Sequence, residues 1–356
     1  MGAKGSTPKL NRRSFLKTSA AAGSAILAAG LPSTPRALAA DGYDHRNERP
    51  GRMQYRKLGR TNFMCSALVF GCGAALRDGK AIRLLERAYD QGVNHFDVGR
   101  TYKGSEAAMA PFLKQHRGDI WVTSKAPART GEALGPDDPL TVDYAKGAMR
   151  YWTQQLDDSL KALDTDYVDA YYLMGVNHAG FVKSEETATA FLKAKEAGKV
   201  GHFGISTHER AQECLEAAIE AGWYSLAMIA MTPSGWYDYR ERQLRKGTLN
   251  LKQVRPLLDQ AREAGIGLVG MKAARHIALN PYGGRYGDTE KQDTSATAAF
   301  DEHYDEKFLQ APFSPFQRTY AYVLENGLDV VNADMQNFKH FEENVVAART
   351  SHEYFA

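Results

Sequence analysis

Cysteine is scarce in this chain. Its 356 residues include three cysteines, Cys65, Cys72 and Cys214. Their spacing matches no metal-binding pattern, and their odd number gives no complete disulfide framework. The sequence therefore predicts neither a metal site built on cysteine nor a fold held together by disulfide bonds.

Beyond its first 39 residues, the chain also lacks a large excess of either positive or negative charge. The formal net charge is +3 over the whole sequence. Residues 1–39 hold six basic residues and no acidic residue, so residues 40–356 carry a net charge of about −3. No basic stripe with interleaved aromatic residues follows. We therefore expect no binding to nucleic acid.

The apolar stretch near the start is too short for a typical membrane span. Residues 20–31 are rich in Ala, Gly and Ser, whereas a spanning helix needs about 20 consecutive apolar residues. Arg12 and Arg13 precede this stretch, and residues 37–39 follow it as an A-x-A cleavage pattern. We interpret residues 1–39 as a twin-arginine signal peptide. An uncleaved membrane anchor is the alternative.

A twin-arginine signal predicts a partner and a location. The chain would engage the twin-arginine export machinery and reach the periplasm, with no stable membrane insertion after cleavage. That route exports proteins that have already folded in the reducing cytoplasm, which agrees with the scarcity of cysteine. It also suits a protein that must acquire a cofactor before it leaves.

The remaining chain is long enough for one large domain. Residues 40–52 are polar and charged and contain Pro50 and Gly51, so they are predicted to be a linker. From residue 53 to residue 356, short apolar runs alternate with longer helical patterns. The predicted strands are 67–70, 93–97, 120–125, 167–173, 200–206, 226–231, 267–271 and 328–332. The predicted helices include 80–91, 142–163, 185–197, 209–221, 251–264 and 315–326.

Eight strands that each feed a helix predict a (β/α)8 TIM barrel in the α/β class. A doubly wound sheet is the competing architecture, and it would carry a glycine fingerprint after its first strand. Gly71 and Gly73 supply two glycines there without the third, and no helix clearly starts at that point. In a barrel the active site lies at the carboxyl ends of the strands.

Three residues at or just after the ends of two neighbouring predicted strands suit proton transfer. Asp97 ends one strand, Tyr102 follows five residues later, and Lys125 ends the next strand. A phenol with its ordinary pKa of about 10 is a poor acid at neutral pH, and a nearby ammonium lowers that pKa. A carboxylate can hold the ammonium in place. The alternative is a structural ion pair with the tyrosine packed as part of a lid.

Four segments carry a resemblance to a known family. They are 53–62 with the sequence MQYRKLGRTN, 159–169 with SLKALDTDYVD, 198–206 with GKVGHFGIS, and 342–344 with EEN. In this order, and with the Asp, Tyr and Lys trio, they resemble the aldo-keto reductases. The resemblance covers 53–348 and implies reduction of a small carbonyl, or oxidation of an alcohol, with a nicotinamide cofactor. It makes Tyr102 the general acid, with Lys125 and Asp97 in support.

One residue departs from the family pattern at the end of the fourth strand. The family has a histidine in a run like LHGIN, whereas this chain reads LMGVN with Met174 in that position. A thioether has no proton to donate. His178, Asn177 or His95 could supply a donor instead, although a simple loop hydrogen bond is the favoured interpretation of His178. A catalytically silenced barrel that binds a small ligand or a protein partner is therefore the alternative function.

The resemblance also implies a set of cofactor contacts. The expected cofactor-binding residues are Ser206, Thr207, Met228, Met271, Lys272, Gln336, Lys339, Glu343 and Asn344. Arginines are common in the family where this chain has Gln336 and Asn337, and Asp334 replaces a usual glycine. NADP and NAD both remain open as the cofactor. The loops 232–247 and 276–313 are expected to shape a substrate pocket.

Overall fold

A closed parallel barrel forms the centre of the molecule. The computed structural model describes residues 38–278 and 294–355. The barrel strands are β3 (Leu68–Gly71), β4 (His95–Asp97), β5 (Trp121–Ala126), β6 (Val168–Met174), β7 (Val200–Thr207), β8 (Leu226–Thr232), β11 (Gly267–Met271) and β12 (Val330–Asp334). They pair in parallel in the order β3-β4-β5-β6-β7-β8-β11-β12, and β12 pairs with β3 to close the ring. The (β/α)8 prediction is confirmed.

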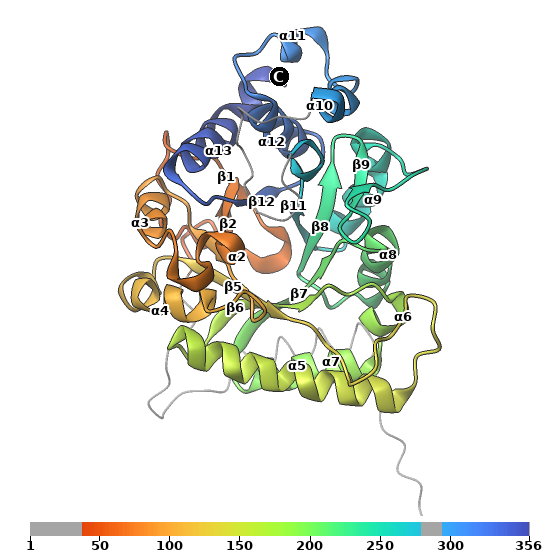
Figure 1. Cartoon of the computed structure of the whole chain (residues 1–356). Coiled ribbons are helices and arrows are strands. Elements are labelled where there is room, and N and C mark those ends of the chain that lie inside the picture. Colours follow the sequence, from red (N-terminus) through yellow and green to blue (C-terminus); the bar gives the residue numbers. More distant parts are fainter. Residues whose placement is uncertain (1–37, 279–293, 356) are drawn as a thin grey trace, which may run out of the picture.

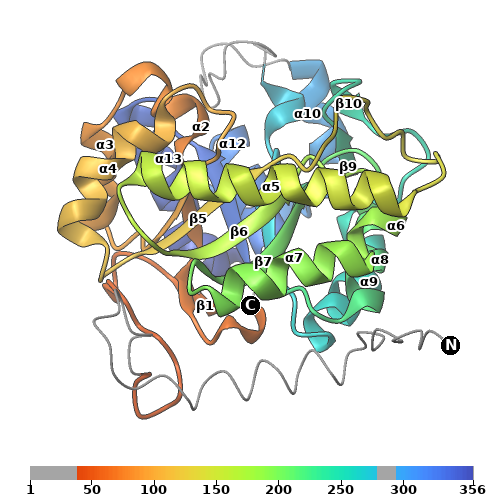
Figure 2. The same ribbon diagram turned by 90° about the horizontal axis from the view of Figure 1, so that it is seen from below.

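Helices surround this barrel, as Figures 1 and 2 show from two directions. They are α2 (Cys72–Ala75), α3 (Arg83–Asp90), α4 (Ser105–His116), α5 (Val142–Leu163), α6 (Ala179–Val182), α7 (Glu185–Glu196), α8 (Ala211–Ala221), α9 (Leu251–Glu263), α10 (Thr294–Asp301), α11 (Glu306–Leu309), α12 (Pro315–Glu325) and α13 (Phe338–Thr350). Two antiparallel hairpins add β1 (Tyr55–Lys57) with β2 (Met64–Ser66), and β9 (Gly235–Asp238) with β10 (Gln243–Leu244).

Several helices begin after a residue whose side chain accepts a hydrogen bond from one of the first free backbone N–H groups of the helix. Thr141 accepts from the backbone N–H of Tyr144 at the start of α5. Asn250 and Ser314 each form a full capping box at the starts of α9 and α12. Pro315 then occupies the first turn of α12, where its missing N–H costs nothing.

Alternation along the strands divides the side chains into two sets. One set packs outward against the helices, and a separate buried cluster fills the barrel interior and includes Val69, Trp121, Tyr172, Met228 and Val269. The hairpin of β1 and β2 closes the amino-terminal end, because Leu58 and Phe63 belong to the same interior cluster. At the opposite end the strands finish on a mixture of polar and apolar residues, among them Asp97, Met174, Thr207 and Met271.

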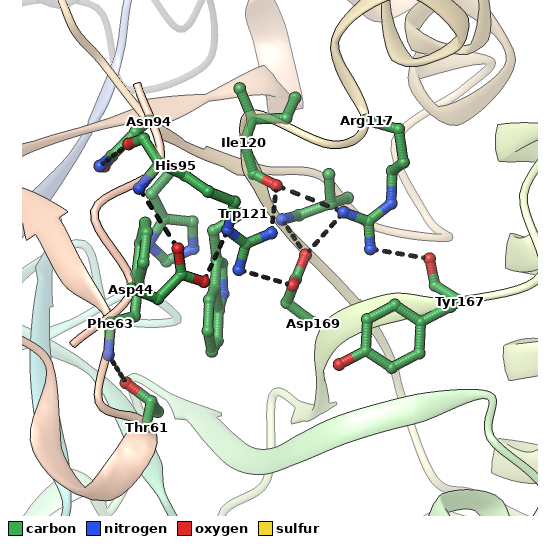
Figure 3. Close-up of polar contacts among 12 residues, drawn as sticks. Asp44, Thr61, Phe63, Asn94, His95, Arg117, Ile120, Trp121, Tyr167 and Asp169 are labelled. Carbon is green, nitrogen blue, oxygen red and sulfur yellow. Dashed lines mark hydrogen bonds and ion pairs between the residues drawn. The ribbon is translucent and has the colours of Figure 1, made fainter. Parts of the chain in front are cut away.

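The segment before the hairpin is fastened to that closed end. The guanidinium of Arg46 donates to Asp44 Oδ2 at 2.8 Å, to the carbonyl oxygen of Ile120 at 2.7 Å and to Asp169 Oδ1 at 3.0 Å. Its partners Asp44, Ile120 and Asp169 are drawn in Figure 3. Arg46 is only 8% exposed and lies over the Trp121 ring at 5.6 Å. Residues 40–52, expected to be a linker, thus make fixed contacts with the barrel.

The predicted signal peptide, residues 1–39, lies outside the described residues, apart from its last two positions. Among the helices of the described ranges, none combines the length and apolar character that a membrane crossing needs. The 276–313 loop contributes α10 and α11, while residues 279–293 within it lie outside the described part.

Candidate active site

Asp97 and Lys125 form a buried ion pair at the carboxyl end of the barrel. Asp97 is the last residue of β4, and Lys125 lies one residue before the end of the neighbouring strand β5. Lys125 Nζ donates to Asp97 Oδ2 at 2.5 Å and to the carbonyl oxygen of Val98 at 2.9 Å. The side chains of Asp97 and Lys125 are 4% and 2% exposed. The ammonium is therefore held in one place by two acceptors.

Tyr102 lies against this ammonium. Lys125 Nζ is 5.1 Å from the centroid of the Tyr102 ring. Two glycines make room for the ring: a methyl group at Gly99 would lie 3.1 Å from Tyr102 Cε2, and one at Gly73 would lie 3.2 Å from the same atom. The predicted trio is thus brought together, and Gly73 and Gly99 support the Tyr102 ring, a role that the sequence pattern does not indicate.

Burial and ion pairing have opposite effects on the pKa values of Asp97 and Lys125. Burial raises the pKa of the Asp97 carboxyl above its ordinary value, and the bonds from Lys125 and Asn332 only partly offset this. Burial alone would lower the pKa of Lys125, but Asp97 and Tyr102 outweigh it, so that pKa is raised. Lys125 therefore stays a cation, which is the form that stabilises a phenolate.

Met174 ends β6 beside Ser206 of β7. Its Sδ accepts a hydrogen bond from Thr101 Oγ1 at 3.4 Å, next to Tyr102 in the chain. A thioether is a weak acceptor, so this contact constrains the Thr101 hydroxyl only loosely. Met174 thus occupies the strand end predicted from the sequence, and Thr101 is a polar neighbour that the sequence did not indicate.

The candidate replacements for a histidine are all engaged elsewhere. His178 Nδ1 accepts from the backbone N–H of Phe181 at 3.0 Å, and Nε2 bonds the carbonyl oxygen of Asp138 at 2.9 Å. His178 thus caps α6 and ties down a loop. His95 lies deep in the barrel, where burial lowers its pKa to about 3, and its Nε2 bonds Thr123 Oγ1 at 2.8 Å. Asn177 Nδ2 bonds Glu209 Oε2 at 3.4 Å.

Part of the expected cofactor set borders the same end of the barrel. Ser206 Oγ lies 3.8 Å from Met228 Sδ, and Met271 ends β11 in a buried position. Thr207 is turned toward its own loop, because its Oγ1 donates to the carbonyl oxygen of Glu209 at 3.0 Å. Lys272 Nζ lies 4.6 Å from the centroid of the Tyr239 ring. The β9 and β10 hairpin therefore reaches this rim.

The rest of that set lies on or just before α13. Gln336 and the exposed Lys339 flank its start, and Glu343 and Asn344 lie one turn further along. Glu343 Oε1 accepts from Ser314 Oγ, whereas its buried Oε2 has no hydrogen-bond partner among the described residues. Burial raises the pKa of Glu343. Glu343 Oε2 is thus a buried polar atom whose bonding the described residues do not satisfy.

A cavity of about 220 Å³ extends sideways from Met174. It lies between the loop after β5 and the segment that links β6 to α6, and its lining residues include Leu134, Tyr144, Phe181 and Arg129. Arg129 is exposed and donates to the Tyr151 hydroxyl at 3.3 Å. The cavity walls combine apolar side chains with the polar Asn177 and His178, and Met174 joins the cavity to the end of β6.

Comparisons with known proteins agree with this geometry. The L-glyceraldehyde 3-phosphate reductase of Escherichia coli K12 is 30% identical to the chain over 239 residues, which cover 62% of this chain and 62% of that protein. The uncharacterized oxidoreductase YqkF of Bacillus subtilis 168 is 30% identical over 160 residues, which cover 44% and 49%. The matched region thus spans less than two thirds of the length of these relatives.

Solved structures share the fold. Aldo-keto reductase AKR11C1 from Bacillus halodurans in its holo form matches with a TM-score of 0.58 and 22% identity, over 83% of this chain and 90% of that chain. The aldo-keto reductase from Klebsiella pneumoniae in complex with NADPH matches with a TM-score of 0.54 and 17% identity, over 83% and 89%. The model of the aldo/keto reductase family matches residues 67–354, which include all eight barrel strands. The chain therefore belongs to the aldo/keto reductase family.

Proposed function

We propose that this chain is a nicotinamide-dependent oxidoreductase that interconverts a small carbonyl compound and its alcohol, with Tyr102 as the proton donor. The observation that supports this proposal most directly is the placement of Lys125. Its buried ammonium is fixed by Asp97 at 2.5 Å and lies against the Tyr102 ring at the carboxyl end of the barrel. A structural ion pair would not need a tyrosine at the rim.

Tyr102, Lys125 and Asp97 have different roles in the proposed proton transfer. Tyr102 Oη donates its proton to the carbonyl oxygen as the carbonyl carbon gains a hydride, and it recovers a proton from the alcohol in the reverse direction. The nicotinamide, when bound, supplies or accepts that hydride. Lys125 stabilises the phenolate that Tyr102 becomes, and Asp97 holds Lys125 in position. Met174 supplies no donor to the oxygen, so the step depends heavily on Tyr102.

The residues around α13 suit an adenine dinucleotide. The unpartnered Glu343 Oε2 would accept the adenine amine, and Asn344 lies beside it in the helix. Lys339 is the cation nearest in sequence to Gln336 and Asn337, both of which are neutral. A 2′-phosphate would thus meet few cations, so we propose that NAD is accepted as well as NADP.

The cavity beside Met174 supports a small substrate. The Escherichia coli relative is named for the reduction of a phosphorylated three-carbon aldehyde. Arg129 is the only Lys or Arg among the residues that line the cavity. We propose that the substrate is a small carbonyl compound whose body lies against Leu134 and Phe181, with room for an anionic group near Arg129.

Export remains part of the proposal. Arg12, Arg13 and the A-x-A pattern at 37–39 support a twin-arginine signal. A periplasmic enzyme would leave the cytoplasm with its nicotinamide already bound. Fractionation of cells that express the full chain tests this: Arg12→Lys with Arg13→Lys should retain the protein in the cytoplasm.

Tyr102→Phe tests the enzymatic proposal. The phenyl ring still packs on Gly73 and Gly99, so nicotinamide binding measured by fluorescence should persist while turnover of a carbonyl panel falls by about 10²–10⁴-fold. Tyr89→Phe, which removes a hydroxyl that bonds Asp119 Oδ2 at 3.4 Å and belongs neither to the trio nor to the cavity lining, is the matched control and should keep turnover. Full turnover in Tyr102→Phe would mean that Tyr102 is not the proton donor, whereas nicotinamide binding without any turnover in the wild type would favour a barrel that acts by binding alone.

A further inference from the structure

We propose that Asn332 is a positioning residue that holds the Asp97 carboxylate in its ionised form and in line with Lys125. The inference rests on the proposed function only for its effect on turnover. The contact itself is a property of the described structure. Asn332 lies on β12 and Asp97 on β4, with β3 between them in the barrel sheet.

The amide of Asn332 points into the barrel mouth. Val330, two residues earlier on β12, belongs to the interior cluster, so alternation along the strand turns Asn332 to the same side. Its Nδ2 donates to Asp97 Oδ2 at 2.6 Å and lies 3.7 Å from Met228 Sδ. A short bond from an amide to a charged oxygen is stronger than one between neutral groups.

Gly71 makes this crossing possible. It is the inward residue at the end of β3, directly between the two partners, and pairs with both Asp97 and Asp334 across the sheet. A methyl group at Gly71 would lie 2.5 Å from Asn332 Oδ1. The same methyl would lie 2.7 Å from the carbonyl oxygen of Ala333, so a larger residue would shift the Asn332 amide, the β12 backbone or both. The glycine after the first barrel strand serves a side-chain contact here, rather than a phosphate-binding loop.

Asp97 depends on this hydrogen-bond donor because its burial disfavours the ionised carboxylate. Oδ2 receives both Lys125 and Asn332, while Oδ1 is buried without a partner among the described residues. The other charged or titratable groups near Asp97 are Lys272, whose charge favours the carboxylate, the phenol of Tyr172, and Tyr102, which lies against Lys125. Asn332 adds a donor without adding a charge that would compete with Lys125.

Titration of Asp97 in full-length protein tests this role. Carbon-13 NMR of the Asp97 carboxyl, assigned by its absence in Asp97→Asn, reports the ionisation without any need for activity. Asn332→Leu removes the donor at similar size and should move the midpoint upward by about one pH unit. Asn332→Asp places a second carboxyl at Asp97 and should move it further. The matched control is Asn326→Ala, which removes an amide that bonds the carbonyl oxygen of Tyr322 and should leave the midpoint unchanged.

The pH profile of turnover provides the second readout. Its acid limb should shift upward with the NMR midpoint in Asn332→Leu, and Gly71→Ala should cause a shift in the same direction although Asn332 is intact. A wild-type midpoint in both Asn332 variants would overturn the inference even if the wild-type enzyme is active. A shifted midpoint in a protein with no oxidoreductase activity would support the positioning role and refute the proposed function instead.

Discussion

Thr101 Oγ1 donates a hydrogen bond to Met174 Sδ over 3.4 Å, so the strand end beside Tyr102 holds a thioether and no strong donor. Met174→His would place an N–H group there. If a missing donor limits the reaction, carbonyl reduction should rise by about 10²–10³-fold, the usual effect of one such donor. The rate of loss of reduced nicotinamide absorbance measures this directly.

Met174→Leu is the matched control for that substitution. Leucine keeps an apolar side chain of similar volume and adds no donor, so its turnover should stay near that of the wild type. A rate in Met174→His no higher than in Met174→Leu would mean that a donor at this position does not limit the reaction.

His178→Ala should affect stability and leave the chemistry unchanged. Both ring nitrogens are engaged, one by the Phe181 N–H and one by the Asp138 carbonyl oxygen. Loss of this cap should lower the free energy of unfolding by about 0.5–2 kcal/mol, measured by urea denaturation. The pH profile of turnover should be unchanged, and a shifted limb would show that His178 does take part in proton transfer.

Gly99→Ala should displace the Tyr102 ring, because the added methyl group would crowd it. The added methyl would lie 3.1 Å from both the Tyr102 ring and Lys125 Cγ, so the phenol must move by a few tenths of an ångström or more. Small displacements of a reacting group can cost about 10²-fold in rate. Steady-state kinetics should show a loss in kcat larger than any change in nicotinamide affinity.

Gly118→Ala makes the same chemical change where the added methyl would have open space. It should retain wild-type kcat. Equal kinetics in Gly99→Ala and Gly118→Ala would argue against a tightly seated Tyr102.

The barrel could be predicted from the sequence because its signals are local. All eight predicted strands overlap the observed ones, and the 142–163 helix has the observed bounds. The sequence also predicts that Asp97, Tyr102 and Lys125 lie close together, since strand ends in a parallel barrel share one face, and the structure places them in contact. These three residues are also close enough to one another in sequence for a local pattern to reveal them.

The contacts that support the trio could not be predicted in the same way. Asn332 reaches Asp97 across an intervening strand, and 235 residues separate them along the chain. Gly99 matters only because two side chains lie behind it. Composition also failed to indicate that Arg46, within a polar and charged segment, is buried at 8% exposure among distant partners. Each of these contacts is a property of packing, which a local pattern does not record.

The contact between Arg46 and Asp169 predicts how stability depends on the closed end of the barrel. Asp169 accepts from Arg46 at 3.0 Å, from Arg117 at 3.0 Å and from the backbone N–H of Val122 at 2.8 Å, and Figure 3 shows Arg117 and Asp169 facing each other. Without Arg46, Asp169 loses one donor but keeps Arg117 and the backbone N–H of Val122. Arg46→Met should therefore lower the free energy of unfolding by about 1.5–3 kcal/mol in urea denaturation, the usual range for a hydrogen bond to a charged group.

The same carboxylate predicts a pH dependence with a definite sign. Burial acts to raise the pKa of Asp169, but Arg117 and Arg46 outweigh it, so the folded-state pKa lies below the ordinary value. The stabilisation is therefore present above the unfolded-state pKa of about 3.9 and is lost as the pH falls through the folded-state pKa. Asp169→Asn should lower stability at neutral pH and flatten this acid dependence, whereas Asp166→Asn, at an exposed position nearby, should preserve it. An acid dependence as steep in Asp169→Asn as in the wild type would assign the effect to other carboxylates.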